Sequence, residues 1–240
     1  MSARARIGTS GYQYDHWRGN FYPRELPKRR WFEHYAQHFD TVEINNTFYH
    51  LPAAGTFDAW RAAAPRGFVC ALKFSRYATH LKRLKDPKEP VERFVDLAQR
   101  LEPCLGPILV QLPPGFQLNE ERLAGFLDVL PRDRRWAVEF RHESWLCEAV
   151  YAVLEQHRAA LCVHDMLEDH PRRVTAPWTY LRFHGDGYAG CYSSQFLSAL
   201  ARRIREMLAQ GIDVYAYFNN DEEGHAVRNA LDLKRYLALA

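Results

Sequence analysis

The chain has 240 residues, of which 47% are hydrophobic and 25% are charged, and its formal net charge at pH 7 is +3. These fractions are ordinary for a globular protein that can build a core. The small net charge excludes a protein that binds nucleic acid over its whole surface, so any basic character that matters must be local.

The five cysteines are scattered along the chain. They form no CxxC pair and no Cys/His spacing typical of zinc, so we expect no structural zinc site. No apolar run approaches the ~20 residues needed to span a bilayer. The first six residues lead directly into a strand-like run and leave no room for a signal peptide. We therefore expect a cytoplasmic protein without a membrane partner.

Eight short apolar runs are typical of strands, and helical patterns separate most of them. The predicted strands are residues 4–8, 41–48, 68–75, 108–112, 136–140, 160–165, 178–184 and 213–219. One predicted helix follows Pro27, another lies between Asn119 and Pro131, and the others span residues 56–64, 91–101, 144–157, 194–209 and 225–239.

The stretch 166–177 contains two prolines and is too short for a regular helix, so we expect no helix between strands six and seven. Alternating strands and helices predict parallel strands. The length is also close to the ~250 residues of a complete (β/α)₈ barrel. We therefore predict that residues 1–240 form a single TIM-barrel domain of the α/β class.

The phase of the strands tests this prediction, because side chains alternate between the two faces of a strand. In the second strand Glu43 and Asn45 share one face, and Val42 and Ile44 share the other. The same segregation recurs in the third, fifth and seventh strands, whose polar sets contain Lys73, Glu139, Arg141, Arg182 and His184. We expect the polar sets to point into the barrel and to gather at the carboxyl ends of the strands, where active sites of such barrels lie.

Ten short strings occur in an order that resembles one known family. They are Ile7-Gly-Thr-Ser-Gly-Tyr12, Trp17-Arg-Gly19, Phe21-Tyr-Pro23, Thr41-Val-Glu-Ile-Asn-Asn-Thr-Phe-Tyr49, Thr79-His80, Gly106-Pro-Ile-Leu-Val-Gln-Leu-Pro-Pro114, Val138-Glu-Phe-Arg-His142, Ser144-Trp145, Arg182-Phe-His-Gly185 and Tyr217-Phe-Asn-Asn220. Together they resemble the YecE-like family, also called domain of unknown function 72. The resemblance implies a TIM barrel and assigns no activity.

Seven ionisable side chains are expected to share the mouth of the barrel. They are Glu43, Glu139, Asp165, Lys73, Arg141, Arg182 and His184. One interpretation is structural: Glu139–Arg141 or Glu43–Lys73 ion pairs would simply close the top of the barrel. Against it, the desolvation of buried ion pairs can exceed their Coulombic gain, so such a cluster is costly unless it binds or reacts.

The leading interpretation is acid–base catalysis. Glu43 and Glu139 would act as acid and base, as in glycoside hydrolysis, and Asp165 and His184 would support or share proton transfer. Aromatic residues of the first loop, among them Tyr12 and Trp17, would stack on a sugar or base ring, or else pack the rim of the barrel.

The cations suit an anionic substrate, since arginine matches phosphate and carboxylate groups. Lys73, Arg141 and Arg182 would hold the anion, and Asn45, Gln111 and Asn219 would orient it. The Gly-rich loop 185–190 lies where such barrels commonly bind phosphate. Lys73 has a second interpretation, because a lysine at a barrel strand end can form a Schiff base with a carbonyl substrate.

Two alternatives remain. Glu139, Asp165 and His184 could ligate a divalent metal in a metal-dependent hydrolase, but Arg141 and Arg182 would oppose a cation, so we expect no metal and no other cofactor. The basic segment 79–85 is either a solvated surface or a site that steers nucleic acid, which would make the protein a non-catalytic anion- or RNA-binding barrel.

We therefore expect an enzyme of the hydrolase or lyase/isomerase class whose partner is a small anionic molecule containing phosphate or sugar. Nucleic acid is a less favoured partner, and the sequence does not indicate an oligomeric state.

Overall fold

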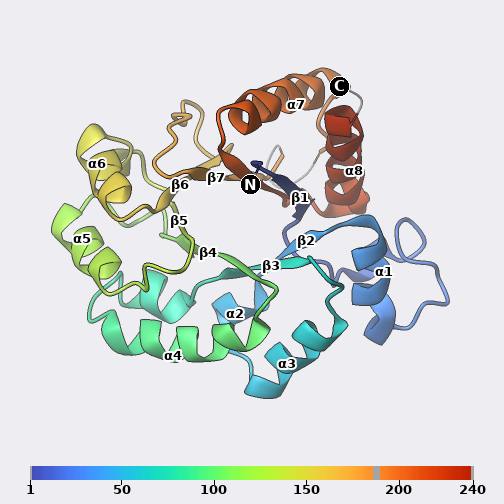
Figure 1. Ribbon diagram of the computed structural model, residues 1–240, viewed down its shortest axis with the longest axis horizontal. Helices are drawn as coiled ribbons and strands as arrows, with labels where there is room; N and C mark the ends of the chain where they lie inside the picture. The colour runs from blue at the N-terminus through green and yellow to red at the C-terminus, as the bar shows by residue number, and fades with distance from the viewer. Residues whose placement is uncertain (1, 186–189, 239–240) are drawn as a thin grey trace.

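Eight parallel strands form a ring in the computed structural model, which describes residues 2–185 and 190–238 (Figure 1). The strands are β1 (Ala5–Thr9), β2 (Thr41–Ile44), β3 (Val69–Lys73), β4 (Leu105–Gln111), β5 (Trp136–Glu139), β6 (Ala160–His164), β7 (Trp178–Phe183) and β8 (Asp213–Phe218). Their order in the sheet is β1-β8-β7-β6-β5-β4-β3-β2. The predicted TIM barrel is therefore confirmed.

The ring closes between β1 and β2. Ser10 pairs with Glu43 in a parallel bridge, and the Gly11 amide donates a hydrogen bond of 2.7 Å to the Glu43 carbonyl oxygen. The two strands approach so closely at Gly8 that a Cβ atom there would lie 2.4 Å from the Thr41 carbonyl oxygen. Only glycine fits this position, because it has no Cβ atom.

Helices cover the outside of the ring (Figure 1). The α-helices are α1 (Trp31–His38), α2 (Asn46–Tyr49), α3 (Ala54–Ala63), α4 (Lys88–Ala98), α5 (Glu120–Asp128), α6 (Glu148–Gln156), α7 (Ser194–Ala209) and α8 (His225–Ala238). As predicted, no helix lies between β6 and β7, whose connection is fully described. No helix of the described residues is long and apolar enough to cross a membrane.

Two predicted elements differ from the structure. The second strand ends at Ile44 rather than at residue 48, and Asn46–Tyr49 form a helical turn. The composition of that segment favours a strand, but the Thr47 hydroxyl donates 2.7 Å to the Lys73 carbonyl oxygen and turns the chain over the end of β3. The predicted helix 144–157 is a short 3₁₀ turn followed by α6, because Cys147 is extended.

The side chains inside the ring form two layers. Below the mouth lies a cluster of Ala71, Leu109, Ala137, Ala160, Cys162, Trp178, Tyr180 and Tyr217. Above it lie Glu43, Glu139 and Arg182, which are 0–1% exposed, and Arg182 forms an ion pair with each carboxylate. The bulky apolar side chains of the opposite strand faces pack against the helices. The predicted strand phase is thus confirmed for these three residues.

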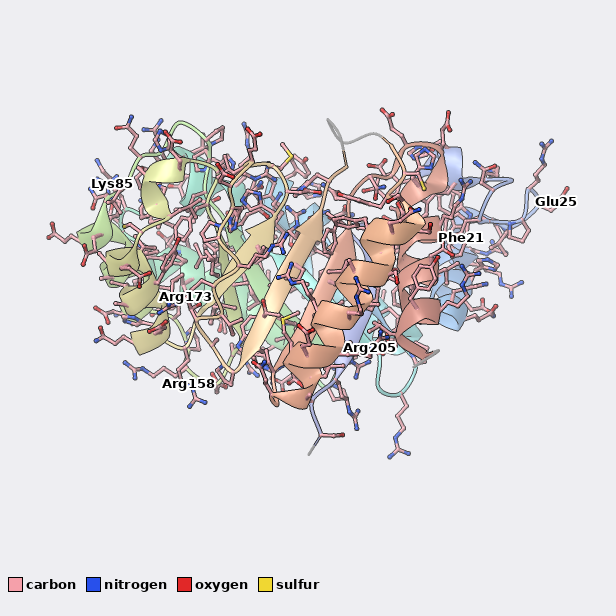
Figure 2. All side chains as sticks on the ribbon, turned by 90° about the horizontal axis from the view of Figure 1, so that it is seen from above. Phe21, Glu25, Lys85, Arg158, Arg173 and Arg205 are labelled. Carbon is pink, nitrogen blue, oxygen red and sulfur yellow. The ribbon has the colours of Figure 1, made fainter. Side chains whose placement is uncertain are left out.

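Other charged side chains lie on the outside. Figure 2 shows Glu25, Lys85 and Arg158 at the periphery of the molecule.

Candidate functional site

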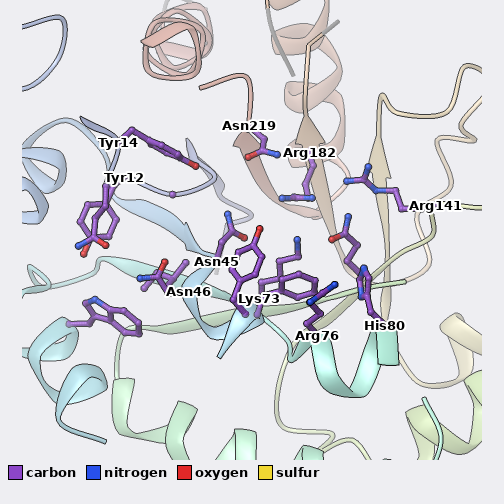
Figure 3. Close-up of a pocket in the computed structure, with 17 residues that line it drawn as sticks. Tyr12, Tyr14, Asn45, Asn46, Lys73, Arg76, His80, Arg141, Arg182 and Asn219 are labelled. Atoms are coloured by element: carbon purple, nitrogen blue, oxygen red, sulfur yellow. The ribbon is translucent and has the colours of Figure 1, made fainter. Parts of the chain in front are cut away.

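A cavity of about 790 Å³ opens at the carboxyl ends of the strands (Figure 3). This volume lies within the range of small-molecule sites. Seven of the residues predicted to bind substrate line it: Tyr12, Asn45, Lys73, Gln111, Arg141, Arg182 and Asn219. They come from strands on all sides of the ring, as the convergence at a barrel mouth requires.

Glu43, Glu139 and Arg182 form a charged layer beneath the cavity, and Arg182 lies at its centre. Its Nε and Nη2 atoms donate to the two carboxylate oxygens of Glu43 at 3.0 and 2.8 Å. Its Nη1 atom donates to Glu139 Oε2 at 2.7 Å. One guanidinium from β7 therefore bridges two carboxylates, from β2 and β5, that are completely buried.

Further donors complete both carboxylates. Ser10 and Tyr180 donate to Glu43, the latter at 2.6 Å. Gln111 donates to Glu139 at 2.9 Å, and Arg141 forms an ion pair with the same oxygen.

Burial raises the pKa of Glu43 and of Glu139, but opposing causes together outweigh it and hold each pKa below the usual value. For Glu43 they are the charge of Arg182 and the hydrogen bonds from Ser10, Tyr180 and Arg182, and for Glu139 they are chiefly the charges of Arg182 and Arg141. Both carboxylates are therefore ionised at neutral pH.

The expected roles of Glu43 and Glu139 as acid and base stay a prediction. A general acid needs a raised pKa, and a general base must reach the substrate. Here both pKa values are lowered, and neither carboxylate lines the cavity. Of the two ion pairs considered from the sequence, Glu139–Arg141 forms, whereas Glu43 pairs with Arg182.

His184 and Asp165 form a second group behind the charged layer. The His184 Nε2 atom lies 3.2 Å from Arg141 and 3.3 Å from Arg182, which can only donate, so Nε2 is the acceptor. The Nδ1 atom then carries the proton and donates to Asp165 at 3.0 Å. Burial lowers the pKa of His184, so the ring is neutral. Asp165 also accepts from Tyr192, and it lines a separate cavity of about 270 Å³ rather than the main one.

Lys73 is the most unusual group of the cavity. Its side chain is 9% exposed, and its Nζ atom lies 4.1 Å from the centroid of the Phe48 ring. No hydrogen bond joins Nζ to any residue in the described ranges. Burial, and next the charge of Arg182, lower the pKa of Lys73 to about 8. About a tenth of this amine is therefore uncharged at pH 7, far more than for an ordinary lysine.

Sequence reasoning missed several residues that line the cavity, among them Arg76, His80 and Asn46. His80 lies on a π-helix (Tyr77–Leu81) that follows β3, in the segment interpreted as a basic loop. Burial, and next the charges of Lys73 and Arg76, lower the pKa of His80 to about 4. Two signals were available: Arg76 follows the predicted third strand, and Thr79-His80 is one of the strings shared with the family.

The charges around the cavity do not balance. Lys73, Arg76, Arg141 and Arg182 line it, whereas the described carboxylates against these cations are Glu43 and Glu139. Four cations and two carboxylates leave an excess of two positive charges in this part of the described structure. Such an arrangement attracts an anion.

Asn45 adds a specific acceptor to the cavity. Its Nδ2 atom donates to Ser10 Oγ at 2.8 Å. Its Oδ1 atom is buried and has no hydrogen-bond partner within the described ranges. Because buried polar atoms are nearly always paired, this oxygen is suited to accept a hydrogen bond from a ligand.

Three other candidate features of the sequence have different outcomes. Trp17 is fully buried, packs on Tyr14 with ring centroids 4.8 Å apart, and does not line the cavity. The Gly-rich loop falls largely on residues 186–189, outside the described residues. Across residues 2–185 and 190–238, no group of three or more His, Cys, Asp and Glu side chains is placed to hold a metal ion. The oxygens of Glu139 and Asp165 instead accept hydrogen bonds from Arg141, Arg182, His184 and Tyr192.

Comparisons with known proteins agree with the resemblance in sequence. A family model described as "Protein of unknown function DUF72" matches residues 6–240. The "UPF0759 protein YunF" of Bacillus subtilis (strain 168) is 26% identical over 96% of this chain and 94% of its own length. The "UPF0759 protein YecE" of Escherichia coli (strain K12) is 33% identical over 48% of this chain and 43% of its own. The crystal structure of a DUF72 family protein from Thermotoga maritima MSB8 superposes with a TM-score of 0.89 at 31% identity, covering 98% of this chain and 99% of that one.

Proposed function

The chain belongs to the DUF72 family, whose description assigns no activity, and we propose from the site itself that the protein is an enzyme acting by acid–base chemistry on a small anionic molecule. The observation that carries this proposal is the cavity of about 790 Å³ with its excess of positive charge and a poorly solvated amine, Lys73.

The substrate is an anion that also carries a hydrogen-bond donor such as a hydroxyl group. Arg76 at the rim binds its phosphate or carboxylate group, since guanidinium donors match these anions, and the positive charge of Arg182 at the floor attracts it. Asn45 Oδ1 accepts a hydrogen bond from the hydroxyl group of the substrate. This hydroxyl group is the hydrogen-bond donor that Oδ1 lacks among the described residues. A sugar phosphate or a hydroxy acid has both features.

Proton transfer is assigned to Lys73 and His80. Both line the cavity, and the pKa of about 8 for Lys73 is close to the neutral pH at which an acid–base catalyst works best. The low pKa of His80, about 4, leaves a neutral imidazole that can accept a proton.

Glu43 and Glu139 then act as positioning residues, because they fix the guanidinium of Arg182 beneath the substrate. Asp165 acts one step further away: it orients His184, whose Nε2 atom accepts from the guanidinium groups of Arg141 and Arg182.

Turnover of a defined pool of phosphorylated and carboxylated metabolites tests this proposal. The pool is incubated with the protein, and loss of each compound is followed by mass spectrometry. We expect at least one compound to be consumed by the wild type and not by Lys73→Met, with both proteins showing the same circular dichroism. A compound consumed equally by both proteins would remove Lys73 from the chemistry, and binding without turnover would favour a non-catalytic anion-binding barrel.

One observation favours a second candidate, the binding of RNA at the same end of the barrel. The Tyr77 ring is 52% exposed and lies 5.7 Å from the Lys82 ammonium, so a base could stack beside a cation. A salt-dependent mobility shift with RNA that is lost when Lys82, Arg83 and Lys85 are changed to Ala would support this function. No RNA affinity at low salt would eliminate it.

A further inference from the structure

We propose that Lys73 forms an imine with the carbonyl carbon of an aldehyde or ketone that carries a phosphate or carboxylate group. This inference rests on the proposed function and names the substrate class of the same cavity.

The backbone and side chain of Lys73 are held for such a role. Lys73 is the last residue of β3, and its carbonyl oxygen accepts the hydrogen bond from the Thr47 hydroxyl. Its Nζ atom lies over the face of the Phe48 ring, which also lines the cavity. The amine is largely buried, and this burial disfavours its charged form although the face of the Phe48 ring favours it.

The neighbouring guanidinium groups of Arg182 and Arg141 also lower the pKa of Lys73, whereas Glu139 and Glu43 oppose them. Glu43 and Glu139, the carboxylates that could have paired with Lys73, are occupied by Arg182 and Arg141. An amine that is desolvated and lies next to cations is activated as a nucleophile. With the pKa at about 8, half of the Lys73 amine is uncharged at pH 8. For an ordinary lysine with a pKa near 10.4 the uncharged fraction is about 0.4%, roughly a hundredfold lower.

The same cations select the carbonyl compound. Arg76 and Arg141 line the cavity together with Lys73, so a bound phosphate or carboxylate places the attached carbonyl group beside the amine. Holding the two reactants together replaces a bimolecular encounter and lowers the barrier. Neutral aldehydes lack this anchor and react more slowly.

The reaction is balanced without a cofactor. The uncharged Lys73 nitrogen adds to the carbonyl carbon, a C–N bond forms, and one amine proton moves to the carbonyl oxygen to give a carbinolamine. The C–O bond then breaks, and the oxygen leaves as water with the second amine proton, so that a C=N bond remains. Protonation of the imine nitrogen makes an electron sink for the next acid–base step.

The test traps this imine with pyridoxal 5′-phosphate, an aldehyde that carries a phosphate group. The intact protein is incubated at pH 8 with less than one equivalent of the aldehyde and reduced with borohydride, which transfers hydride to the imine carbon and leaves a stable secondary amine. Peptide mass spectrometry then measures the label on each of the six lysines in the sequence. We expect Lys73 to carry at least about tenfold more label than any other lysine, with a rate that rises to a plateau above pH 8.

Matched probes and a variant separate the possible outcomes. Pyridoxal, which lacks the phosphate, should label Lys73 at least about tenfold more slowly, and inorganic phosphate should protect Lys73 from pyridoxal 5′-phosphate. Lys73→Arg should retain phosphate binding and lose the selective label.

If phosphate binds but the label follows only the exposure of the lysines, the imine is overturned and the anion site stands. If phosphate neither binds nor protects and Lys73 is not labelled, both proposals fail. Selective labelling that pyridoxal equals and phosphate does not prevent would support the nucleophile and overturn its anionic substrate.

Discussion

Removing the guanidinium of Arg182 is the sharpest perturbation of the charged layer. Arg182→Met keeps much of the side-chain volume but leaves Glu43 without any cation, because its other donors are the neutral hydroxyls of Ser10 and Tyr180. Glu139 keeps Arg141. The variant therefore isolates the cost of one uncompensated buried carboxylate.

The expected loss of stability is large because the ion pairs of Arg182 are buried. Removing one partner of a buried, hydrogen-bonded ion pair lowers the free energy of unfolding by about 3–5 kcal/mol. For a chain of this length each 1 kcal/mol lowers the melting temperature by roughly 2–4 °C, so the expected loss at pH 7 is about 6–20 °C. Arg202→Met, which removes an exposed arginine from α7, is the control and should change stability by less than about 0.5 kcal/mol.

The dependence on pH distinguishes a lost charge partner from lost packing. In the wild type the pKa of Glu43 is lowered below 4.5, so its stabilising effect is present above that value and is lost as the pH falls through the lowered pKa. In Arg182→Met the guanidinium no longer opposes burial, so the pKa of Glu43 rises and the carboxyl group takes up a proton as the pH falls from 7 toward 5. The difference in melting temperature should therefore shrink over this range.

Thermal unfolding followed by circular dichroism at several pH values measures both quantities. Adding Glu43→Gln to Arg182→Met should recover part of the lost stability, since it removes the uncompensated charge. A melting temperature within 2 °C of the wild type at pH 7, or a difference that grows on acidification, would refute the assignment of Arg182 as the common partner of the two carboxylates.

Three further predictions concern the cavity. Arg76→Gln should weaken sulfate binding about tenfold, or 1.4 kcal/mol, in isothermal titration calorimetry. The control Arg122→Gln, which lies in a separate surface hollow, should leave sulfate binding unchanged. Equal losses in the two variants would show that sulfate responds only to the overall charge of the protein. Sulfate affinity should fall as the pH rises through about 8, where Lys73 loses its charge, and a profile that Lys73→Arg leaves unchanged would contradict this origin. Glu139→Gln removes one of the two negative charges that face Arg141 and Arg182. It should lower the kcat of any turnover more than about tenfold without unfolding the protein. Full activity would exclude Glu139 from the site.

The barrel and the inward-facing charges could be predicted from the sequence because both depend on local periodicity. The alternation in residues 41–45 and 178–184 decides which face of each strand is polar, and closure of the ring turns the polar faces toward each other. The Asn119 cap is equally local, because its side chain accepts a hydrogen bond from the backbone amide of Arg122, three residues along the chain. Neither inference needs the distance between residues that are far apart in the chain.

Features that depend on distances across the barrel could not be predicted in this way. Whether Glu43 pairs with Lys73 or with Arg182 is decided by how far each side chain reaches across the ring. The burial of Trp17 depends on its hydrogen bond of 2.9 Å to the Asp221 carbonyl oxygen, 204 residues along the chain. His80 reaches the cavity because a π-helix displaces the backbone after β3, and no periodicity in the sequence indicates that turn.

The charged layer explains why so many ionisable groups can be buried under one cavity. Arg182 pairs with both carboxylates, and Arg141 supplies the second positive charge. The carboxylates, Ser10 and His184 together occupy the donors of Arg182. The layer is internally satisfied, which leaves Lys73 and Arg76 as the cations that face the cavity without a carboxylate partner in the described part of the chain. Burial lowers the pKa of Lys73 most, the charge of Arg182 adds to this effect, and Glu139 and Glu43 oppose it.

A crystal structure of the protein grown with a mixture of phosphorylated and carboxylated metabolites tests the central claim most directly. The account predicts a trapped anion in the cavity of about 790 Å³, with its phosphate or carboxylate oxygens within hydrogen-bond distance of Arg76 and its reacting carbon beside Lys73 Nζ. A cavity that holds only water while the ligand binds elsewhere on the protein would contradict it.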